Sequence, residues 1–339
     1  MALLGFGNVG QALAALLLRK QDDIENQLGI TFKVTGIATE SHGIAIDRNG
    51  INLKQALGLV QSGQSLEEIS RQPTAISETL AFIENCDAQI LFETIPVNYK
   101  TGQPAVDYIH AALTRGMTVT TANKGPVVHA YRALTLLAES NGQKFYFESA
   151  VMDGAPVFGL FRETLPVATI KSVRGILNST TNLILSRMEA GESFDQAVAY
   201  AQSIDIAESD PSGDVDGWDA AIKISALVTV MMGVPLKPQD VPRTGIRGIN
   251  AQAIEAAKAE GKRWKLVCEA VRDGDQVRAK VAPKMVPINS PMYGIEGTTS
   301  IVQLESDVLG RLSLIEENPG PHTTAYGLLA DFLNAVIET

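Results

Sequence analysis

Side chains that could move a proton are concentrated in one acid-rich stretch, residues 208–223. Asp216, Asp219 and Lys223 are spaced so that a helix beginning near Asp216 would carry all three on one face. The residues that follow are mostly apolar, and a lysine on a buried helix needs a partner or a wet cavity. An ammonium group beside a carboxylate at the edge of a cavity can donate or accept a proton.

Two further acids, Glu208 and Asp214, precede this helix in a polar loop and could receive the ammonium group of a substrate. A second interpretation needs no chemistry. The helix dipole favours acids near a helix N-terminus, and Asp219 with Lys223 could be an ordinary surface ion pair. The spacing by itself favours neither interpretation.

A glycine-rich turn at the start of the chain has the spacing of a dinucleotide-binding site. Residues 5–10, Gly-Phe-Gly-Asn-Val-Gly, match G-x-G-x-x-G between an expected strand and an expected helix. The first glycine permits the tight turn, the second lets the backbone approach a pyrophosphate, and the third lets helix and strand pack closely. The alternative is that the glycines only allow close packing of the chain and bind no ligand. We predict that the dinucleotide is bound by Gly5, Gly7, Asn8, Val9 and Gly10.

The end of the second expected strand, residues 32–38, bears on which dinucleotide is bound. Glu40 could bind the ribose 2′-hydroxyl of NAD, although it comes a residue or two later than the usual acid. No arginine stands beside it to take the 2′-phosphate of NADP. The sequence slightly favours NAD, and NADP with a solvent-exposed Glu40 stays open.

Strands and helices that alternate in the first half must position these residues, which is the pattern of a parallel sheet wrapped by helices. Only four residues precede Gly5, fewer than in a usual strand, and this predicts a shortened start. The expected strands are Ala2–Leu4, Phe32–Ala38, Ala88–Phe92, Met117–Thr121 and Lys144–Phe147, and the expected helices are Gln11–Lys20, Gly102–Arg115 and Val127–Glu139.

The second half has an α+β character, with loops expected over residues 208–214 and 281–297. The expected strands are Ile170–Ile176, Trp264–Val271, Val277–Lys284, Thr299–Leu304 and Arg311–Ile315, and the expected helices are Asn182–Met188, Phe194–Ser203, Asp216 to about Met232, and Thr324–Val336. The predicted fold class is α/β, a Rossmann-type doubly wound parallel sheet with a second α+β domain. The dinucleotide domain would be residues 1–148 with about 320–339, and the substrate domain 149–319.

The composition argues against several other functions. The 339 residues carry a net charge of -10, whereas nucleic acid or an anionic membrane surface would attract a basic protein. No stretch is long and apolar enough to span a membrane. The only two cysteines, Cys86 and Cys268, do not suggest a disulfide framework, so the cytoplasm is the expected compartment.

Several stretches, taken in order, resemble the homoserine dehydrogenase family. The acid-rich stretch has the family's pattern of Glu, Asp-Pro, Asp-x-Asp-Gly and Asp-Ala-Ala-x-Lys. The set covers almost the whole chain and is far more specific than any single member. The other matching stretches are residues 5–10, Glu93–Asn98, Thr120–Lys124, Glu148–Val151, Gly175–Asn182, Gly245–Ile246, Tyr293–Gly297 and Thr323–Ala325.

The resemblance implies an NAD(P)-dependent oxidoreductase that interconverts L-homoserine and L-aspartate 4-semialdehyde, in threonine, methionine and isoleucine biosynthesis. It implies that Lys223 lies beside the reacting carbon and that Asp219 orients it. Lys124 would be a second active-site lysine, and either lysine could take the hydroxyl proton.

The resemblance also implies the binding residues. Glu208 and Asp214 would hold the substrate ammonium, and Thr180 with the backbone near Ser179 would close the pocket, although Ser179 stands where the family often has glycine. The remaining implied residues are Thr94, Ile95, Pro96 and Gly320 at the cofactor, and Glu148 with the carbonyl oxygens of Val151 and Asp153 at a monovalent cation, sodium.

The family fold implies a second domain that also forms a homodimer or higher homo-oligomer. Many relatives append a domain that senses threonine, and this chain ends about 15 residues after Thr324. We therefore expect a short form whose rate is unchanged by millimolar threonine.

Two rival functions are weighed against this one. A phosphorylating semialdehyde dehydrogenase would need a nucleophilic cysteine, and both cysteines are interpreted as structural. A non-catalytic nucleotide-binding homologue would be expected to lack Lys124, Asp219 or Lys223, and all three are present.

Overall fold

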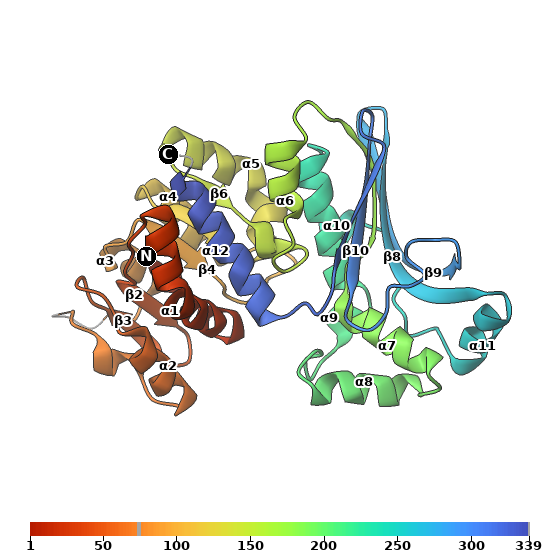
Figure 1. Cartoon of the computed structure of the whole chain (residues 1–339), viewed down its shortest axis with the longest axis horizontal. Helices are drawn as coiled ribbons and strands as arrows, with labels where there is room; N and C mark the ends of the chain where they lie inside the picture. Colours follow the sequence, from red (N-terminus) through yellow and green to blue (C-terminus); the bar gives the residue numbers. More distant parts are fainter. Residues whose placement is uncertain (73–75, 338–339) are drawn as a thin grey trace. The chain divides into compact units, whose positions relative to one another are not determined.

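In the computed structural model, which describes residues 1–72 and 76–337, the chain divides into two units: Met1–Pro156 with Gly320–Thr339, and Val157–Pro319 (Figure 1). The first unit is built on a six-stranded sheet with the order β3-β2-β1-β4-β5-β6. All neighbours are parallel except β3, which is antiparallel to β2. The strands are β1 (Ala2–Leu4), β2 (Gly36–Thr39), β3 (Gly43–Ile46), β4 (Ile90–Glu93), β5 (Thr118–Thr121) and β6 (Phe145–Tyr146).

The strand order of this sheet reverses between β1 and β4. From β1 the chain goes to β2 on one side and later returns to β4 on the other side. Parallel sheets of this kind bind ligands at such a reversal of strand order, because the loops diverge there. The glycine turn follows β1 and Thr94 follows β4, so both lie at this edge of the sheet.

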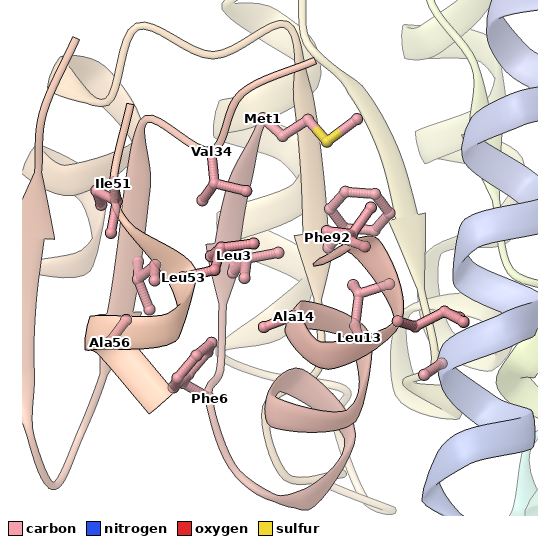
Figure 2. Close-up of a cluster of buried hydrophobic side chains, with 14 of the residues drawn as sticks. Met1, Leu3, Phe6, Leu13, Ala14, Val34, Ile51, Leu53, Ala56 and Phe92 are labelled. Carbon is pink, nitrogen blue, oxygen red and sulfur yellow. The ribbon is translucent and has the colours of Figure 1, made fainter. Parts of the chain in front are cut away.

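Helices cover both faces of this sheet. A buried apolar cluster joins Leu3 and Phe92 of the sheet to α1, α2 and α12, and the ring of Phe92 contacts that of Phe332 edge-on (Figure 2). On the other face α3 packs on β2, and α4 packs on β4 and β5. The helices are α1 (Asn8–Leu28), α2 (Leu53–Gln61), α3 (Thr79–Asn85), α4 (Ala105–Thr114), α5 (Lys124–Ser140) and α12 (Pro321–Ile337).

Several elements of the first unit differ from the prediction, and helices α2 and α3 were not predicted at all. Helix α1 continues to Leu28 and ends at Gly29, which has the left-handed conformation; its later part is mostly exposed, so apolar spacing did not reveal it. Strand β2 begins only at Gly36. Strand β3 was not predicted: the hydroxyl oxygen of Thr39 accepts the N–H groups of Ser41 and His42, and this tight turn makes the next strand antiparallel.

Residues 149–156, expected in the second domain, belong to the first unit. The hydroxyl of Ser149 donates to the carbonyl oxygen of Thr324 at 2.7 Å, and the N–H of Glu148 donates to the Asp331 carboxylate at 2.8 Å. A Cβ on Gly154 would lie 2.2 Å from the carbonyl oxygen of Thr323. Helix α12 therefore holds this segment through both hydrogen bonds and close backbone packing.

The second unit contains a five-stranded antiparallel sheet with the order β11-β10-β7-β8-β9. Helix α10 packs on β7, β8 and β9. The strands are β7 (Ile170–Ile176), β8 (Lys262–Asp273), β9 (Gln276–Pro287), β10 (Ser300–Ser306) and β11 (Arg311–Glu316). The helices are α6 (Val157–Gly159), α7 (Ser179–Glu189), α8 (Phe194–Ser203), α9 (Ser212–Val215), α10 (Trp218–Met231) and α11 (Ala251–Ala259).

The prediction for the acid-rich stretch was wrong in one respect. The expected loop forms the short helix α9 at its end, and Gly217, with φ of 82°, separates α9 from α10. Asp216 therefore caps α9 and pairs with Arg247, so it shares no helix face with Asp219 and Lys223.

Two more expectations for this unit were incomplete. Strand β9 continues to Pro287, into the stretch expected as loop, because its pairing with β8 extends to Lys262. Helix α11 was not predicted; Asn250 caps its N-terminus. Among the described residues, no helix has the length and apolar character needed to cross a membrane.

Candidate active site

The glycine turn of the first unit has a geometry that suits a pyrophosphate. Gly5 has φ of +97°, and a Cβ on Gly10 would lie 2.4 Å from the carbonyl oxygen of Gly5. A Cβ on Gly7 would meet no atom within 4 Å, so this side of the turn is open. The first turn of α1, which contains Asn8 and Val9, has no acidic residue and no side-chain cap. Backbone N–H groups and the positive end of the helix dipole are therefore available to an anion.

The loop after β4 is hydrogen-bonded to this turn. The N–H of Thr94 donates to the carbonyl oxygen of Leu4 at 2.8 Å, and its hydroxyl donates to that of Gly5 at 3.1 Å. Ile95 is half-buried and Pro96 is exposed at the same edge of the sheet. Thr94, the first of the three residues expected at the nicotinamide, is thus hydrogen-bonded to the turn expected at the pyrophosphate.

Lys124 is positioned by the end of β5. It is the first residue of α5 and follows Asn123, whose side-chain oxygen accepts the N–H of Gly125 at 3.0 Å and caps the helix. The hydroxyl oxygen of Thr121 accepts the N–H of Asn123 at 2.9 Å. Lys124 is half-buried and lies in the first unit, whereas Lys223 lies in the second.

Sequence reasoning missed Glu93, the last residue of β4. Its carboxylate is fully buried, and it accepts hydrogen bonds from Thr121, Asn123 and the N–H of Ile95. Burial raises the pKa of Glu93 to about 7, although these hydrogen bonds act in the opposite direction. An acid that ends an otherwise apolar strand, Ile90–Phe92, was the signal that could have identified it.

Two other predicted cofactor residues flank the same unit. Glu40 is exposed and follows Thr39, the last residue of β2, so it stands closer to the strand end than the sequence suggested. Gly320 precedes α12, and its carbonyl oxygen accepts the hydroxyl groups of Thr323 and Thr324.

In the second unit, one amide side chain joins the predicted catalytic and ammonium-binding acids. The side-chain nitrogen of Asn178 donates to Asp214 at 2.6 Å and to Asp219 at 2.9 Å. The Nζ of Lys223 lies 3.1 Å from the Asp219 carboxylate and donates to the carbonyl oxygen of Leu177 at 2.7 Å. Both ionised side chains are largely buried, with 14% of Lys223 and 11% of Asp219 exposed. A buried pair is the interpretation that the structure supports for Asp219 and Lys223, over an exposed surface pair.

Asn178 was not predicted as a site residue, yet it holds this cluster together. It follows β7 and caps α7, since its side-chain oxygen accepts the N–H of Thr181 at 2.8 Å. The side-chain oxygen of Asn178 therefore caps helix α7, while its side-chain nitrogen is directed to Asp214 and Asp219. The N-cap position of Asn178, directly before Ser179 and Thr180, was a signal in the sequence that could have identified it.

The pKa of Asp214 is shifted by its place in this cluster. Burial and the neighbouring Asp219 charge raise its pKa to about 6, while Asn178, Lys223 and Thr180 lower it. Two carboxylates this close favour a cation between them or a proton on one of them. The cluster is thus suited to the ammonium group of a substrate.

Of the other predicted substrate residues, Thr180 acts on Asp214, whereas Ser179 and Glu208 make other contacts. Thr180 is buried and its hydroxyl donates to the carbonyl oxygen of Ile206 at 3.1 Å. The Ser179 hydroxyl lies 3.3 Å from that of Ser300. The side chain of Glu208 is exposed, and Gln202 fixes its backbone by donating to its carbonyl oxygen.

The cysteines lack the properties of a nucleophile. Cys86 and Cys268 are both buried, and burial raises the pKa of Cys268 to about 12 and also raises that of Cys86. A thiolate is the reactive form, so neither residue suits an acyl-enzyme route. The interpretation of both as structural is in agreement with their burial.

A glycine turn at the strand-order reversal, as in the first unit, is typical of dinucleotide-binding proteins, and the second unit holds a buried lysine–carboxylate cluster suited to proton transfer. The chain is an oxidoreductase of the nicotinamide-dinucleotide class. Two family models match it: "Homoserine dehydrogenase, NAD binding domain" over residues 5–148, and "Homoserine dehydrogenase" over residues 156–333. The chain belongs to the homoserine dehydrogenase family.

Individual proteins resemble the chain over nearly its full length. The "NAD(+)-dependent homoserine dehydrogenase" of Pseudomonas canavaninivorans is 34% identical over 98% of this chain and 95% of its own length. A crystal structure of a candidate homoserine dehydrogenase from Archaeoglobus fulgidus is 34% identical, with a TM-score of 0.86 and 98% of each chain covered. A hyperthermophilic archaeal homoserine dehydrogenase in complex with NADPH is 27% identical, with a TM-score of 0.82, and 100% of this chain and 97% of the other are covered. None of these matches supports a non-catalytic nucleotide-binding protein.

Proposed function

We propose that this chain interconverts L-homoserine and L-aspartate 4-semialdehyde and prefers NAD. The observation that carries the proposal is the cluster of Asp214, Asn178, Asp219 and Lys223 in the second unit. In this cluster the Asn178 amide is hydrogen-bonded to both carboxylates, and the ammonium group of Lys223 pairs with one of them, Asp219. L-Homoserine has groups that match these side chains: its ammonium group can pair with a carboxylate, and its hydroxyl group can exchange a proton with the lysine.

The cluster supports a distinct role for each residue. Asp214 binds the substrate ammonium, with Glu208 as a second acid. Lys223 holds a hydrogen bond to the substrate hydroxyl oxygen and moves a proton there. Asp219 orients Lys223, and Asn178 fixes the separation of the two acids. Ser179 and Thr180 begin α7 beside this cluster and bound the substrate.

The first unit supports cofactor binding at the glycine turn. A bound nicotinamide ring supplies the chemistry of accepting or returning a hydride. Gly5, Gly7 and Gly10, with Asn8 and Val9, bind the pyrophosphate. The ribose and nicotinamide contacts come from Glu40, Thr94, Ile95, Pro96 and Gly320. Lys124 is the second lysine proposed at the reacting group.

The first experiment is an assay of purified protein with L-homoserine and either NAD or NADP, followed by the absorbance of the reduced cofactor. We expect reduction of both, with a higher kcat/KM for NAD because Glu40 stands at the end of β2. Glu40→Gln is expected to raise the KM for NAD by about 10-fold, the loss of a charge-assisted hydrogen bond at a partly exposed site. No reduction of either cofactor, despite measurable cofactor binding, would contradict the proposal.

We also propose a sodium ion bound by Glu148 and the carbonyl oxygens of Val151 and Asp153. Glu148 and Val151 are both buried, and Asp153 has a left-handed φ of 38° in the turn that follows. Carboxylate and carbonyl oxygens are hard ligands that suit such an ion. The thermal midpoint is expected to be higher in sodium chloride than in choline chloride of equal concentration, because the ion binds the folded state. Glu148→Gln is expected to abolish this difference, and an equal midpoint in both salts for the wild type would rule the site out.

We further propose that the chain forms a homodimer through one face of the β7–β11 sheet. Arg174 and Glu269 pair across strands at 2.9 Å, and Arg311 lies 3.5 Å from Glu305 on the same face. This face carries charges of both signs, so a second copy of the same face could meet it with opposite charges; we therefore propose a second copy as the occupant. Sedimentation equilibrium is expected to give twice the chain mass, and Arg174→Glu, which sets like charges together, is expected to give monomers. A wild-type monomer at micromolar concentration would contradict this proposal.

A further inference from the structure

A buried acidic side chain lies at the base of the loops that follow β4 and β5, and the proposed chemistry does not use it. Glu93 is 0% exposed. In the sheet it stands opposite Leu4 of β1 and Thr121 of β5. It therefore lies between the strand that leads to the glycine turn and the strand that leads to Lys124. A carboxyl group in such a place needs hydrogen-bond partners, because water is excluded.

The partners of Glu93 are three donors. The hydroxyl of Thr121 donates to one carboxylate oxygen at 2.6 Å. The N–H of Ile95, at 2.8 Å, and the side-chain nitrogen of Asn123, at 3.3 Å, donate to the other. The Thr121 hydroxyl oxygen already accepts the N–H of Asn123, which directs its own proton to Glu93. All three contacts stabilise the ionised carboxylate, and a protonated one would present its hydrogen to a ring of donors.

The same contacts fix two loops at once. Ile95 belongs to the loop that is proposed to border the nicotinamide. Asn123 caps α5 directly before Lys124, and its side-chain nitrogen also donates to the carbonyl oxygen of Ile95 at 3.3 Å. The two loops are thus joined to each other and to Glu93 in one hydrogen-bonded network.

We propose that Glu93 is a positioning residue, whose negative charge holds the Ile95 and Asn123 loops in the arrangement that binds the cofactor and presents Lys124. The roles of Ile95 and Lys124 rest on the proposed function. Because Glu93 is fully buried, it would act through these loops and not by contact with a ligand. Loss of its charge is expected to weaken cofactor binding and to slow turnover.

The buried position gives this role a pH dependence. Burial raises the pKa of Glu93 to about 7. The groups that face it are neutral: Leu4 on β1, Thr121 on β5, and Ile95 and Asn123 on the loops; Lys124 is the charged residue next along the chain. Cofactor affinity and kcat/KM are therefore expected to fall as the pH drops through about 7 and Glu93 takes a proton.

The effect of Glu93 on stability has the opposite sign. Its pKa in the folded state lies above the ordinary value of 4.5, so the folded state binds the proton more tightly than the unfolded state. Its contribution to stability is thus present below about pH 4.5 and is lost as the pH rises to about 7. Glu93→Gln should therefore be no less stable than the wild type above pH 7, although it binds the cofactor less well.

Two neighbouring threonines provide a matched test of the network. Thr121→Val removes the donor to Glu93 together with the acceptor of the Asn123 N–H, whereas the Thr120 hydroxyl on the same strand is buried and has no hydrogen-bond partner among the described residues. The dissociation constant for NAD is measured by fluorescence between about pH 5 and 9 for the wild type, Glu93→Gln, Thr121→Val and Thr120→Val. Thermal midpoints and kcat/KM for L-homoserine are measured on the same samples.

We expect Glu93→Gln to lower kcat/KM by roughly 100-fold above pH 7, the effect of displacing a reacting group by about 1 Å. In this variant the affinity for NAD should no longer change near pH 7. Thr121→Val is expected to move that change to higher pH by roughly one unit, because a hydrogen bond that lowers the pKa is removed. Thr120→Val is expected to follow the wild-type curve. A wild-type pH dependence in Glu93→Gln, or equal curves for the two threonine variants, would overturn the proposal.

These outcomes separate the positioning role from the proposed function. The cofactor titration needs no substrate, so Glu93 can be judged even if L-homoserine is not oxidised; in that event only the proposed function fails. If Glu93→Gln does not fold, the threonine pair decides the matter, because a purely structural role would not shift a pH profile.

Discussion

Replacing Lys223 with methionine is expected to lower kcat for L-homoserine oxidation by about 10²- to 10⁴-fold, the range attributed to a positioned general acid or base. The Nζ that this substitution removes lies 3.1 Å from the Asp219 carboxylate and donates a hydrogen bond to the carbonyl oxygen of Leu177. Methionine fills a similar volume but cannot carry a proton. Steady-state kinetics with saturating L-homoserine and NAD measures the effect. The dissociation constant for NAD is expected to stay within about twofold, because the residues proposed to bind the cofactor lie in the other unit.

The same substitution removes the cationic partner of a largely buried carboxylate. We expect Lys223→Met to lower the free energy of unfolding by about 3 kcal/mol, because the buried Asp219 carboxyl group loses its cationic partner in a site with little water. A second substitution, Asp219→Asn, should restore most of this stability while kcat stays low, since the hydrogen bond from Asn178 can still be accepted. Urea titration of the single and double variants separates lost chemistry from lost stability.

Either lysine could move the proton according to the sequence, and this experiment also bears on that choice. A Lys223→Met protein that keeps more than about a tenth of the wild-type kcat would mean that proton transfer does not depend on Lys223. Lys124→Met would then be the variant expected to lose turnover. A large loss in both variants would mean that the two ammonium groups act together.

Replacing Asp214 with asparagine is expected to raise the KM for L-homoserine by about 100-fold with a smaller change in kcat, the cost of removing one partner of a buried charge pair. The substrate ammonium would lose its carboxylate, whereas the hydrogen bond from Asn178 can still be accepted by the asparagine oxygen. The exposed Asp210 in the same stretch provides the control, and Asp210→Asn should leave KM unchanged. A KM that stays at the wild-type value in Asp214→Asn would remove Asp214 from the ammonium site.

The pH dependence of this KM follows from the titration of Asp214. Because burial and the Asp219 charge raise its pKa to about 6, the wild-type KM should rise as the pH falls through about 6, and the KM of Asp214→Asn should not. The stability effect has the opposite sign. The folded state binds the proton more tightly than the unfolded state. The contribution of Asp214 to stability is therefore present below about pH 4 and is lost as the pH rises to about 6. Asp214→Asn should therefore be at least as stable as the wild type at neutral pH.

Local sequence patterns predicted the elements that depend on near neighbours. Strand β7 and helix α8 were predicted with the bounds that the structure has. Helix α8 begins at a Ser193–Gln196 capping box, a signal that lies within the segment itself. The Asp219–Lys223 pair was predicted by its spacing within one turn of helix. The glycine turn was predicted because a strand–turn–helix junction of this kind needs glycine at fixed positions.

Other features depended on contacts between distant parts of the chain. Strand β3 and the extension of β9 to Pro287 are determined by the strands beside them, and residues 149–156 by α12. A pattern that reads one segment at a time cannot detect such partners. Gly217 is the converse case, since its left-handed conformation divides a stretch that the spacing had joined into one helix.

The sequence by itself determined which types of residue are available to this enzyme: the glycines, the two lysines, and the acids of residues 208–219. The tertiary structure decided how these groups are paired. Asn178 joins Asp214 to Asp219, and Glu93 joins the loops after β4 and β5. The contact between Glu93 and Thr121 spans 28 residues of sequence, and that between Asn178 and Asp219 spans 41. The physical reason is that burial and hydrogen bonding determine the charge state of a carboxyl group, and both arise only when strands and helices that are distant in sequence pack together.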